Sequence, residues 1–214
     1  MQFDLQGADK SQAYRLLASV VVPRPIALVT TLGADGTVNA APYSFFNLLG
    51  SSPPVVALGI GDRSADTPKD TRANIERSGE VVVNLVGEAL AEAMNVCGID
   101  FPAGVTELDA AGLTTLPSTQ VSCPRLAESP VHLECRLHSV VFIGDNRIVL
   151  AEVVGLHVCD EFLDGDPARP RVRTEALHLI GRMHGGGWYA RTSDLFDLPR
   201  VPYEEWRERQ GHTK

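Results

Sequence analysis

Short apolar runs bounded by turn residues dominate the chain, and most of them predict strands rather than helices. The predicted strands cover residues 26–32, 37–41, 55–60, 80–86, 131–143 and 147–158. Asp35-Gly36 and Gly144-Asp145-Asn146 separate pairs of these runs and are typical of hairpin turns. Because strands outnumber helices and join mostly by hairpins, the pattern predicts a mainly β fold, an antiparallel β-barrel with packed helices.

Three segments carry helix signals instead. The predicted helices cover residues 11–19, 67–79 and 88–97. In the second of them, Thr67 or Asp70 is expected to cap the start and Pro68 suits the first turn. Gly79 is expected to end this helix, because glycine readily adopts the left-handed conformation that follows a helix.

The length and composition predict a single domain that spans residues 1–214. The chain has 214 residues, of which 44% are hydrophobic, so it can bury a substantial core. Residues 98–128 are rich in turn signals and are expected to form an irregular surface excursion. A polar C-terminal tail is expected over residues 191–214.

Charge and cysteine usage narrow the function further. The formal net charge of −8 argues against a nucleic-acid partner, and no apolar run approaches the length of a membrane span. With no leader signal at Met1, we expect a cytoplasmic protein with reduced cysteines. His132, Cys135 and His138 lie in an alternating strand pattern that puts successive members on opposite faces, so no metal site is predicted.

One polar segment, residues 63–74, has the composition of a phosphate site. A helix start presents unpaired N–H groups and the positive end of the helix dipole. The side chains that could add charge or hydroxyl donors there are Arg63, Ser64, Thr67, Lys69, Thr71 and Arg72. An ordinary capped helix with solvated charges is the alternative that these residues leave open.

A second segment, residues 39–47, suits a flat heterocycle. Pro42 interrupts strand hydrogen bonding, so neighbouring backbone groups can face a ligand. Polar partners for a ring edge are Asn39, Ser44 and Asn47, and aromatic partners for its faces are Tyr43, Phe45 and Phe46. The alternative is a sheet-edge strand whose aromatic side chains fill the core.

Taken together and in this order, the two segments resemble the flavin reductase-like family, whose members fold as FMN-binding split β-barrels. The resemblance is carried by "LLASVVVPRPIALVTTLGADGTVNAAPYSFFNLLGSSPPVVALGIGDRSADTPKDTRANI", from Leu16 to Ile75, and continues through Val81-Val82-Val83-Asn84-Leu85. The glycine-rich segment near residues 181–186 matches more loosely. In all, the resemblance covers residues 14–200.

By position, the resemblance implies a role for each part of the site. Residues 39–47 would border the isoalloxazine ring and ribityl chain, with Ala41, Pro42, Tyr43 and Ser44 nearest the ring. The phosphate end would be held by Arg63, Ser64, Lys69, Asp70 and Thr71. His184, Trp188 or Tyr189 would close the site, from the same subunit or its partner, because the family usually forms homodimers. No catalytic side chain is implied, since the flavin itself carries the redox chemistry.

The function implied is an FMN-binding oxidoreductase, in the first place an NADH- or NADPH-dependent flavin reductase. The resemblance leaves open an FMN-bearing electron carrier without nicotinamide activity of its own, and a barrel that has lost flavin. A monooxygenase or an electron-transfer protein would be the partner that receives the electrons.

Overall fold

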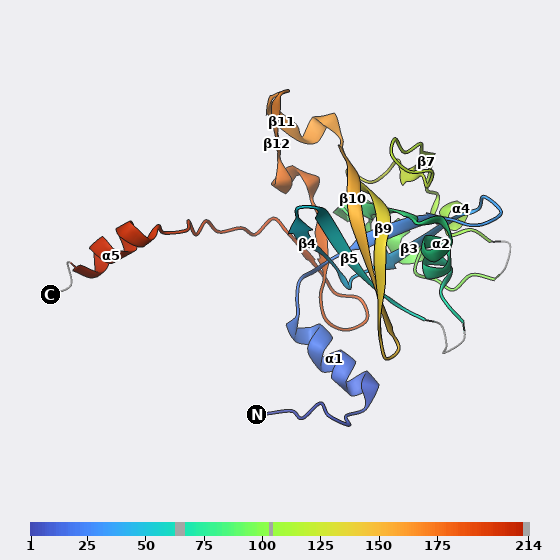
Figure 1. Cartoon of the computed structure of the whole chain (residues 1–214), viewed down its shortest axis with the longest axis horizontal. Coiled ribbons are helices and arrows are strands. Elements are labelled where there is room, and N and C mark those ends of the chain that lie inside the picture. Colours follow the sequence, from blue (N-terminus) through green and yellow to red (C-terminus); the bar gives the residue numbers. More distant parts are fainter. Residues whose placement is uncertain (63–66, 103–104, 212–214) are drawn as a thin grey trace.

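Seven antiparallel strands form the central sheet of the molecule (Figure 1). The computed structural model describes residues 1–62, 67–102 and 105–211. In spatial order the strands are β3 (Val38–Tyr43), β2 (Ala27–Leu32), β6 (Glu80–Leu85), β9 (Val131–Ile143), β10 (Asn146–Val158), β5 (Pro54–Gly61) and β4 (Phe46–Ser51). Strands β3 and β5 stand apart in this order yet contact each other, so the sheet curls. The predicted mainly β fold with packed helices is confirmed.

Three small sheets flank the central one. They pair β1 (Arg24–Pro25), β13 (Ile180–Arg182) and β14 (Tyr189–Arg191), then β7 (Thr115–Leu116) with β8 (Arg125–Leu126), and β11 (Leu163–Asp166) with β12 (Arg169–Val172). Strand β13 approaches the chain around Pro23 closely, because a Cβ atom on Gly181 would lie 2.7 Å from the Cβ of Pro23. This contact needs glycine, and it brings the C-terminal segment beside the start of the barrel.

The helices are short and lie around the sheet. They are α1 (Lys10–Val20), α2 (Asp70–Ser78), α3 (Ala91–Val96), α4 (Glu107–Ala111) and α5 (Tyr203–Gly211), with 3-10 turns at Glu88–Leu90, Asp160–Phe162 and Thr174–Leu177. Among the described residues, no helix is long and apolar enough to cross a membrane. Figure 1 shows α1 and α5 projecting from the body, α5 at the end of an extended arm.

The start of α2 differs from its prediction, whereas its end agrees. Lys69, not Thr67 or Asp70, is the N-cap residue, and within the described residues its side chain makes no capping hydrogen bond. Pro68 therefore precedes the helix instead of lying in its first turn. At the other end, Gly79 adopts the left-handed conformation with φ of 71°, as predicted.

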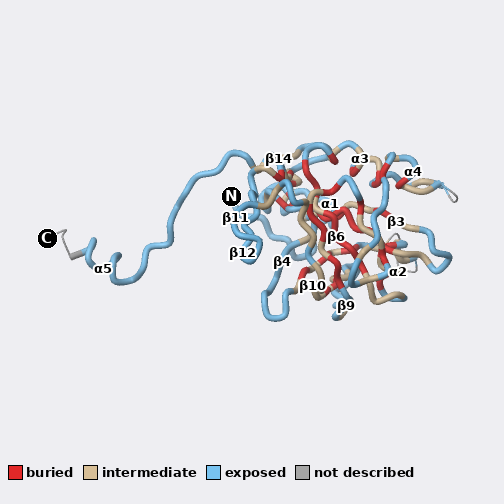
Figure 2. Tube along the Cα trace, turned by 90° about the horizontal axis from the view of Figure 1, so that it is seen from above, coloured by how far each residue is buried: buried red, intermediate tan, exposed pale blue. Residues whose placement is uncertain are grey.

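Buried residues concentrate in the body of the molecule (Figure 2). Among the described residues they form two hydrophobic clusters, one on each face of β2. Val29 belongs to the cluster inside the curled sheet, and Leu28 belongs to the cluster beneath α3 and α4. The second cluster also contains Leu108 and Leu126, both buried. The prediction of an irregular surface excursion over residues 98–128 is therefore wrong in part, because this stretch forms α4, β7 and β8 and supplies core side chains.

A buried carboxylate fixes part of that stretch to the sheet. Glu134 in β9 is fully buried and accepts backbone N–H bonds from Thr119, Gln120 and Val121. Its Oε1 also contacts Nε2 of His157 in β10. Burial alone would raise the pKa of Glu134, but the Thr119 and Gln120 N–H groups and His157 hold it below its usual value of 4.5.

We predict that Glu134 makes the fold sensitive to acid. Because its pKa is lower in the folded chain, its stabilisation is complete above pH 4.5 and is lost as the pH falls through the folded pKa. Glu134→Gln should lower the free energy of unfolding at pH 7 by about 2–3 kcal/mol, since the N–H donors lose a charged acceptor. Urea unfolding between pH 3 and pH 7 measures both effects (roughly the range over which carboxyls titrate). The exposed Glu161→Gln is the control, and equal curves for the two variants would contradict the assignment.

Candidate flavin site

The pocket that gathers most of the predicted residues, which we call the main pocket for that reason, lies between β3 at the end of the sheet, the start of α2 and the segment before α4. Its volume is about 530 Å³. Four predicted residues on β3 line it, namely Asn39, Ala41, Pro42 and Tyr43. Three more come from the start of α2, namely Lys69, Asp70 and Thr71. The structure therefore brings together seven of the residues that the sequence assigned to one site.

Two side-chain hydrogen bonds set the position of α2 against the sheet. Nδ2 of Asn39 donates to Oγ1 of Thr71 at 3.0 Å, and Nδ2 of Asn74 donates to Oγ1 of Thr31 at 3.2 Å. Thr31 and Thr71, the two acceptors, are both buried, whereas Asn39 and Asn74 are half-buried. These two hydrogen bonds hold the first turn of the helix over the edge strand, where it forms one wall of the main pocket.

The charges around the main pocket are mixed. Nζ of Lys69 lies 5.8 Å from the ring centroid of Tyr43, within range of a cation–π contact. Three carboxylates, those of Asp70, Asp100 and Glu107, also line the pocket. Binding of an anion here therefore relies on Lys69 and the helix start more than on net charge.

Of the side chains predicted for the phosphate site, Thr67 and Arg72 are described but do not belong to the lining of the main pocket. Arg72 forms ion pairs instead, with Asp62 at 3.2 Å and with Glu76 at 3.9 Å. The sequence pattern could not show this, because Asp62 lies at the end of another strand. Arg63 and Ser64 lie outside the described residues.

A side pocket of about 200 Å³ adjoins the main pocket and shares Pro42, Tyr43 and Gly98 with it. Ser44 and Tyr189 line this side pocket, as the sequence predicted for a flavin site, and Arg182 joins them. The Arg182 guanidinium lies 4.8 Å from the ring centroid of Tyr189. Its Nη2 donates to the carbonyl oxygens of Gly185 and Gly186 at 3.0 and 2.9 Å.

Two other predicted residues lie apart from both pockets. His184 is exposed and stacks on Trp188, with ring centroids 6.1 Å apart. Asn47 lies on β4, where it lines a different hollow that we call the apolar groove. Lining residues of the apolar groove are Pro23, Pro25, Ile26, Phe46, Asn47, Leu48, Pro54, Val56, Leu85, Val86, Leu133, Val153, Leu156, Leu179, Ile180, Gly181 and Thr192. The placement of Asn47 differs from the prediction because β4 turns away after Ser44 to pair with β5.

Arg24 is a structural residue of the site whose role sequence reasoning missed. Its side chain is buried, and its guanidinium donates to the carbonyl oxygens of Ala18 at 2.7 Å, Val21 at 2.8 Å and Met183 at 3.0 Å. Its Nε also approaches Oγ of Ser44 at 3.4 Å. A single cation between Pro23 and Pro25 beside an apolar run is the signal that could have drawn attention to it.

Cys97, which lines the main pocket, is held as a thiol. Burial raises its pKa to about 11, and the negative charge of Glu107 adds to the effect. A nucleophilic or metal-binding role would need the thiolate. The side chain therefore acts as an apolar wall of the main pocket.

The fold agrees with comparisons to known proteins, which place the chain in a class of split-barrel flavoproteins. The family model described as flavin reductase like domain matches residues 19–176, and the chain belongs to this family. The 2-nitrobenzoate 2-nitroreductase NbaA of Pseudomonas fluorescens is 36% identical with a TM-score of 0.84, over 95% of this chain and 97% of that one.

Two further solved structures show the same architecture. Nitrilotriacetate monooxygenase component B from Bacillus cereus is 28% identical with a TM-score of 0.84, over 92% of this chain and 98% of that one. A protein with a split barrel domain from Shewanella frigidimarina is 20% identical with a TM-score of 0.78, over 94% of this chain and 100% of that one. The split-barrel fold implied by the sequence resemblance is thereby confirmed.

We predict that Arg24 stabilises the walls of the site. Arg24→Met should lower the free energy of unfolding by about 2–4 kcal/mol, because buried carbonyl groups lose a charged donor. It should also speed amide hydrogen exchange in residues 183–188, which Arg24 holds through Met183. The matched control is Arg15→Met on the exposed face of α1. Equal stability of the two variants would show that the hydrogen bonds of Arg24 do not stabilise the fold.

Proposed function

We propose that the chain binds FMN across the two adjoining pockets and acts as an NADH- or NADPH-dependent flavin reductase. The observation that carries this proposal is the junction of a helix start bearing Lys69 with the end strand β3, on a chain of the flavin reductase family. One end of the combined hollow suits a phosphate, and the other suits a planar ring.

The phosphate end is assigned to the first turn of α2. Lys69, the N-cap residue, has extended backbone conformation. Among the described residues, its side chain makes no hydrogen bond that caps the helix. The N–H groups of a first turn have no partner within the helix, and its dipole favours an anion. Lys69 would supply a full positive charge and Thr71 a hydroxyl, while Asn39 holds Thr71 in place.

The ring end is assigned to β3 and the side pocket. β3 is the last strand in the order of the described sheet, so backbone groups of Ala41 can face a heterocycle edge. Tyr189 and Pro42 provide flat apolar surface, and Ser44 provides a hydroxyl. When bound there, FMN would supply the capacity to accept electrons from a nicotinamide and pass them on. The protein's part is to bind, to orient and to limit access of water.

A second candidate function is the reduction of a nitroaromatic acid at the same site. The likeness to the 2-nitrobenzoate 2-nitroreductase of P. fluorescens favours it. So does Arg182, whose guanidinium lines the side pocket and could pair with a carboxylate. We also propose that the chain forms a homodimer and serves a monooxygenase partner. The likeness to a monooxygenase component B supports the monooxygenase partner.

We predict that Lys69→Ala combined with Thr71→Ala weakens FMN binding at least tenfold while the fold persists. A charge-assisted hydrogen bond is worth about 1.5–3 kcal/mol, and about 1.4 kcal/mol corresponds to tenfold in affinity. Titration of flavin fluorescence measures the affinity, and circular dichroism checks the fold. The control is Lys10→Ala, a lysine on α1 whose side chain is 89% exposed. Unchanged FMN affinity in the folded double variant would remove the phosphate assignment.

The reaction class is tested by anaerobic absorbance of the FMN-loaded protein. Rapid bleaching of the flavin band by NADH or NADPH is expected for a reductase. A band that stays unchanged would identify an electron carrier that needs a protein donor, and failure to take up FMN would contradict the whole proposal. In the bleached sample, 2-nitrobenzoate should restore the band faster than nitrobenzene does if Arg182 binds a carboxylate, and Arg182→Met should abolish that difference.

A further inference from the structure

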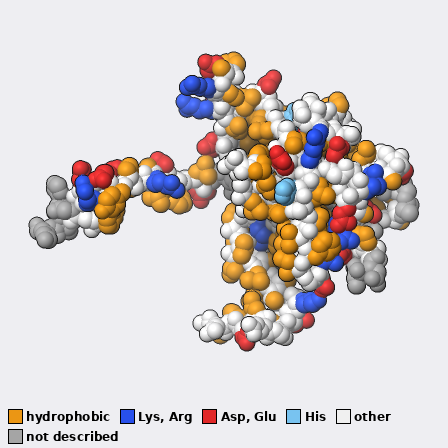
Figure 3. Space-filling view, in the orientation of Figure 1, with side chains coloured by type: hydrophobic (Ala, Val, Ile, Leu, Met, Phe, Trp, Pro, Cys, Tyr) orange, Lys and Arg blue, Asp and Glu red, His pale blue; other side chains and the backbone are white. Residues whose placement is uncertain are grey.

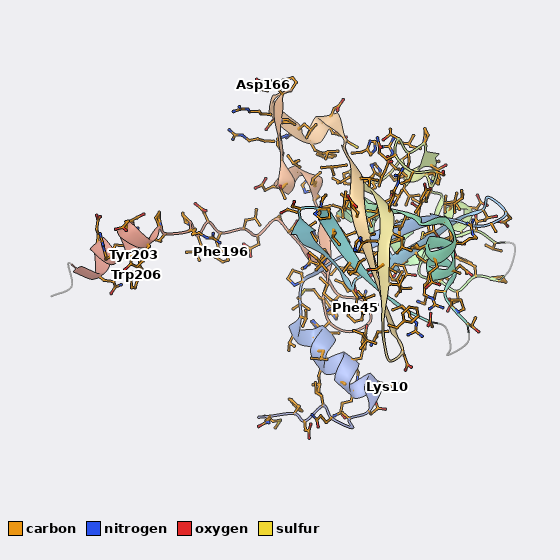
Figure 4. All side chains as sticks on the ribbon, viewed as in Figure 1. Lys10, Phe45, Asp166, Phe196, Tyr203 and Trp206 are labelled. Atoms are coloured by element: carbon orange, nitrogen blue, oxygen red, sulfur yellow. The ribbon has the colours of Figure 1, made fainter. Side chains whose placement is uncertain are left out.

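The last part of the chain leaves the body as an extended arm. Thr192 is its root, because its N–H and its hydroxyl both donate to the carbonyl oxygen of Leu179 at 3.2 and 2.8 Å. The arm, which we define as residues 193–211, then runs away from the barrel (Figures 1 and 4). Phe196 and Leu198 are 87% and 82% exposed, so apolar side chains that normally seek burial face solvent within this subunit.

The helix at the end of the arm needs a surface to pack on. α5 has nine residues, and isolated helices shorter than about 12–15 residues are marginal in water. Tyr203 and Trp206 stack with ring centroids 6.0 Å apart, and both are exposed. Figure 4 shows both labelled side chains on α5, remote from the barrel. An exposed aromatic pair on a helix of this length is typical of a segment that docks elsewhere.

The apolar groove offers a surface of matching chemistry. Its volume is about 570 Å³ and most of its lining is apolar. Leu48 and Leu156 on its walls are each 62% exposed. Thr192, the root of the arm, belongs to the same lining. In Figure 3 hydrophobic side chains follow the arm and cover the face of the body near the place where the arm begins.

We propose that two copies of this chain exchange their arms. The arm of each copy lies in the apolar groove of the other copy. This inference rests on the homodimer of the proposed function and specifies how its subunits hold each other. Because the arm begins at the groove, a twofold axis near Thr192 puts each arm beside the groove of the other copy. Each subunit then covers the apolar surface that the other leaves exposed.

The reach and stiffness of the arm fit an exchange between subunits. Ten residues separate Thr192 from Tyr203, and at about 3.3 Å per extended residue they span roughly 33 Å. A body of this size has a radius of gyration of roughly 16 Å, so the arm can cross most of a neighbour. Pro199 and Pro202 favour extended backbone at the residues before them, which stiffens the arm.

Tryptophan fluorescence tests whether the arm docks. The chain has two tryptophans, so Trp188→Phe leaves Trp206 as the reporter on α5. Analytical ultracentrifugation of the same samples gives the mass. We expect blue-shifted emission where the chain sediments as a dimer and a red shift on dilution to monomers. Blue-shifted emission from monomers, independent of concentration, would mean that the arm folds onto its own body and would overturn the exchange.

Paired charge substitutions test the groove as the receptor. Phe196→Asp on the arm and Leu156→Asp in the groove should each raise the dimer dissociation constant at least tenfold. Mixing the two variants should recover part of the affinity, because one intact arm then meets one intact groove. Ile143→Asp is the matched control, an exposed apolar side chain at the tip of the β9–β10 hairpin. Equal weakening by the control, or no recovery on mixing, would overturn the proposal.

Truncation of the chain after Thr192, which removes the arm and the residues that follow it, separates this inference from the homodimer itself. We expect the truncated chain to dimerise at least tenfold more weakly. If it dimerises as tightly as the full chain, the arm exchange is wrong and the homodimer stands. If the full chain is monomeric throughout, both are wrong. FMN uptake, measured on the same samples, reports on the flavin proposal independently of either result.

Discussion

The candidate site depends on the contact between α2 and the sheet, which two side-chain hydrogen bonds define. Asn39 reaches Thr71 at 3.0 Å and Asn74 reaches Thr31 at 3.2 Å. Arg77 adds a hydrogen bond to the carbonyl oxygen of Leu32, and Arg72 pairs with Asp62. The apolar packing of Ile75 buries the helix but is non-directional, so these polar contacts together fix its rotation. The polar bonds therefore decide where the first turn of α2 points, and with it the position of Lys69 relative to β3.

Buried charged side chains hold the irregular segments in place by bonding their backbone groups, as strand pairing does in the sheet. Glu134 collects backbone N–H groups from residues 119–121, and Arg24 collects carbonyl groups from α1 and from Met183. Each charged group satisfies several backbone partners that lack a regular ladder. Of the two, Arg24 bears on the site, because it contacts Ser44 and Met183 beside the side pocket without lining either pocket itself. A flavin site can therefore be weakened by a substitution that never touches the ligand.

Sequence patterns anticipated what is local and missed what depends on distant partners. The hairpin from β9 to β10 and the end of α2 at Gly79 follow from alternation and turn residues, and the structure has both. Strand β4 was not predicted, because most of its residues are exposed and its apolar positions do not alternate. Asn47 was therefore predicted at the flavin site, whereas the structure places it at the apolar groove. The pairing of Arg72 with Asp62 and the N–H donors that Glu134 accepts join residues of different segments, and no periodic pattern in the sequence records such pairs.

The electrostatics of the main pocket bear on how firmly a flavin would be held in the proposed site. Asp70, Asp100 and Glu107 oppose a phosphate dianion near Lys69, on a chain whose formal net charge is −8. Long-range attraction therefore contributes little, and affinity has to come from short hydrogen bonds at the start of α2 and from contact of the ring with Tyr43, Pro42 and Tyr189. Such contacts are short-ranged and only weakly screened by salt. A flavin bound in this way would be held by fit, and it could leave once a partner or a change of redox state altered that fit.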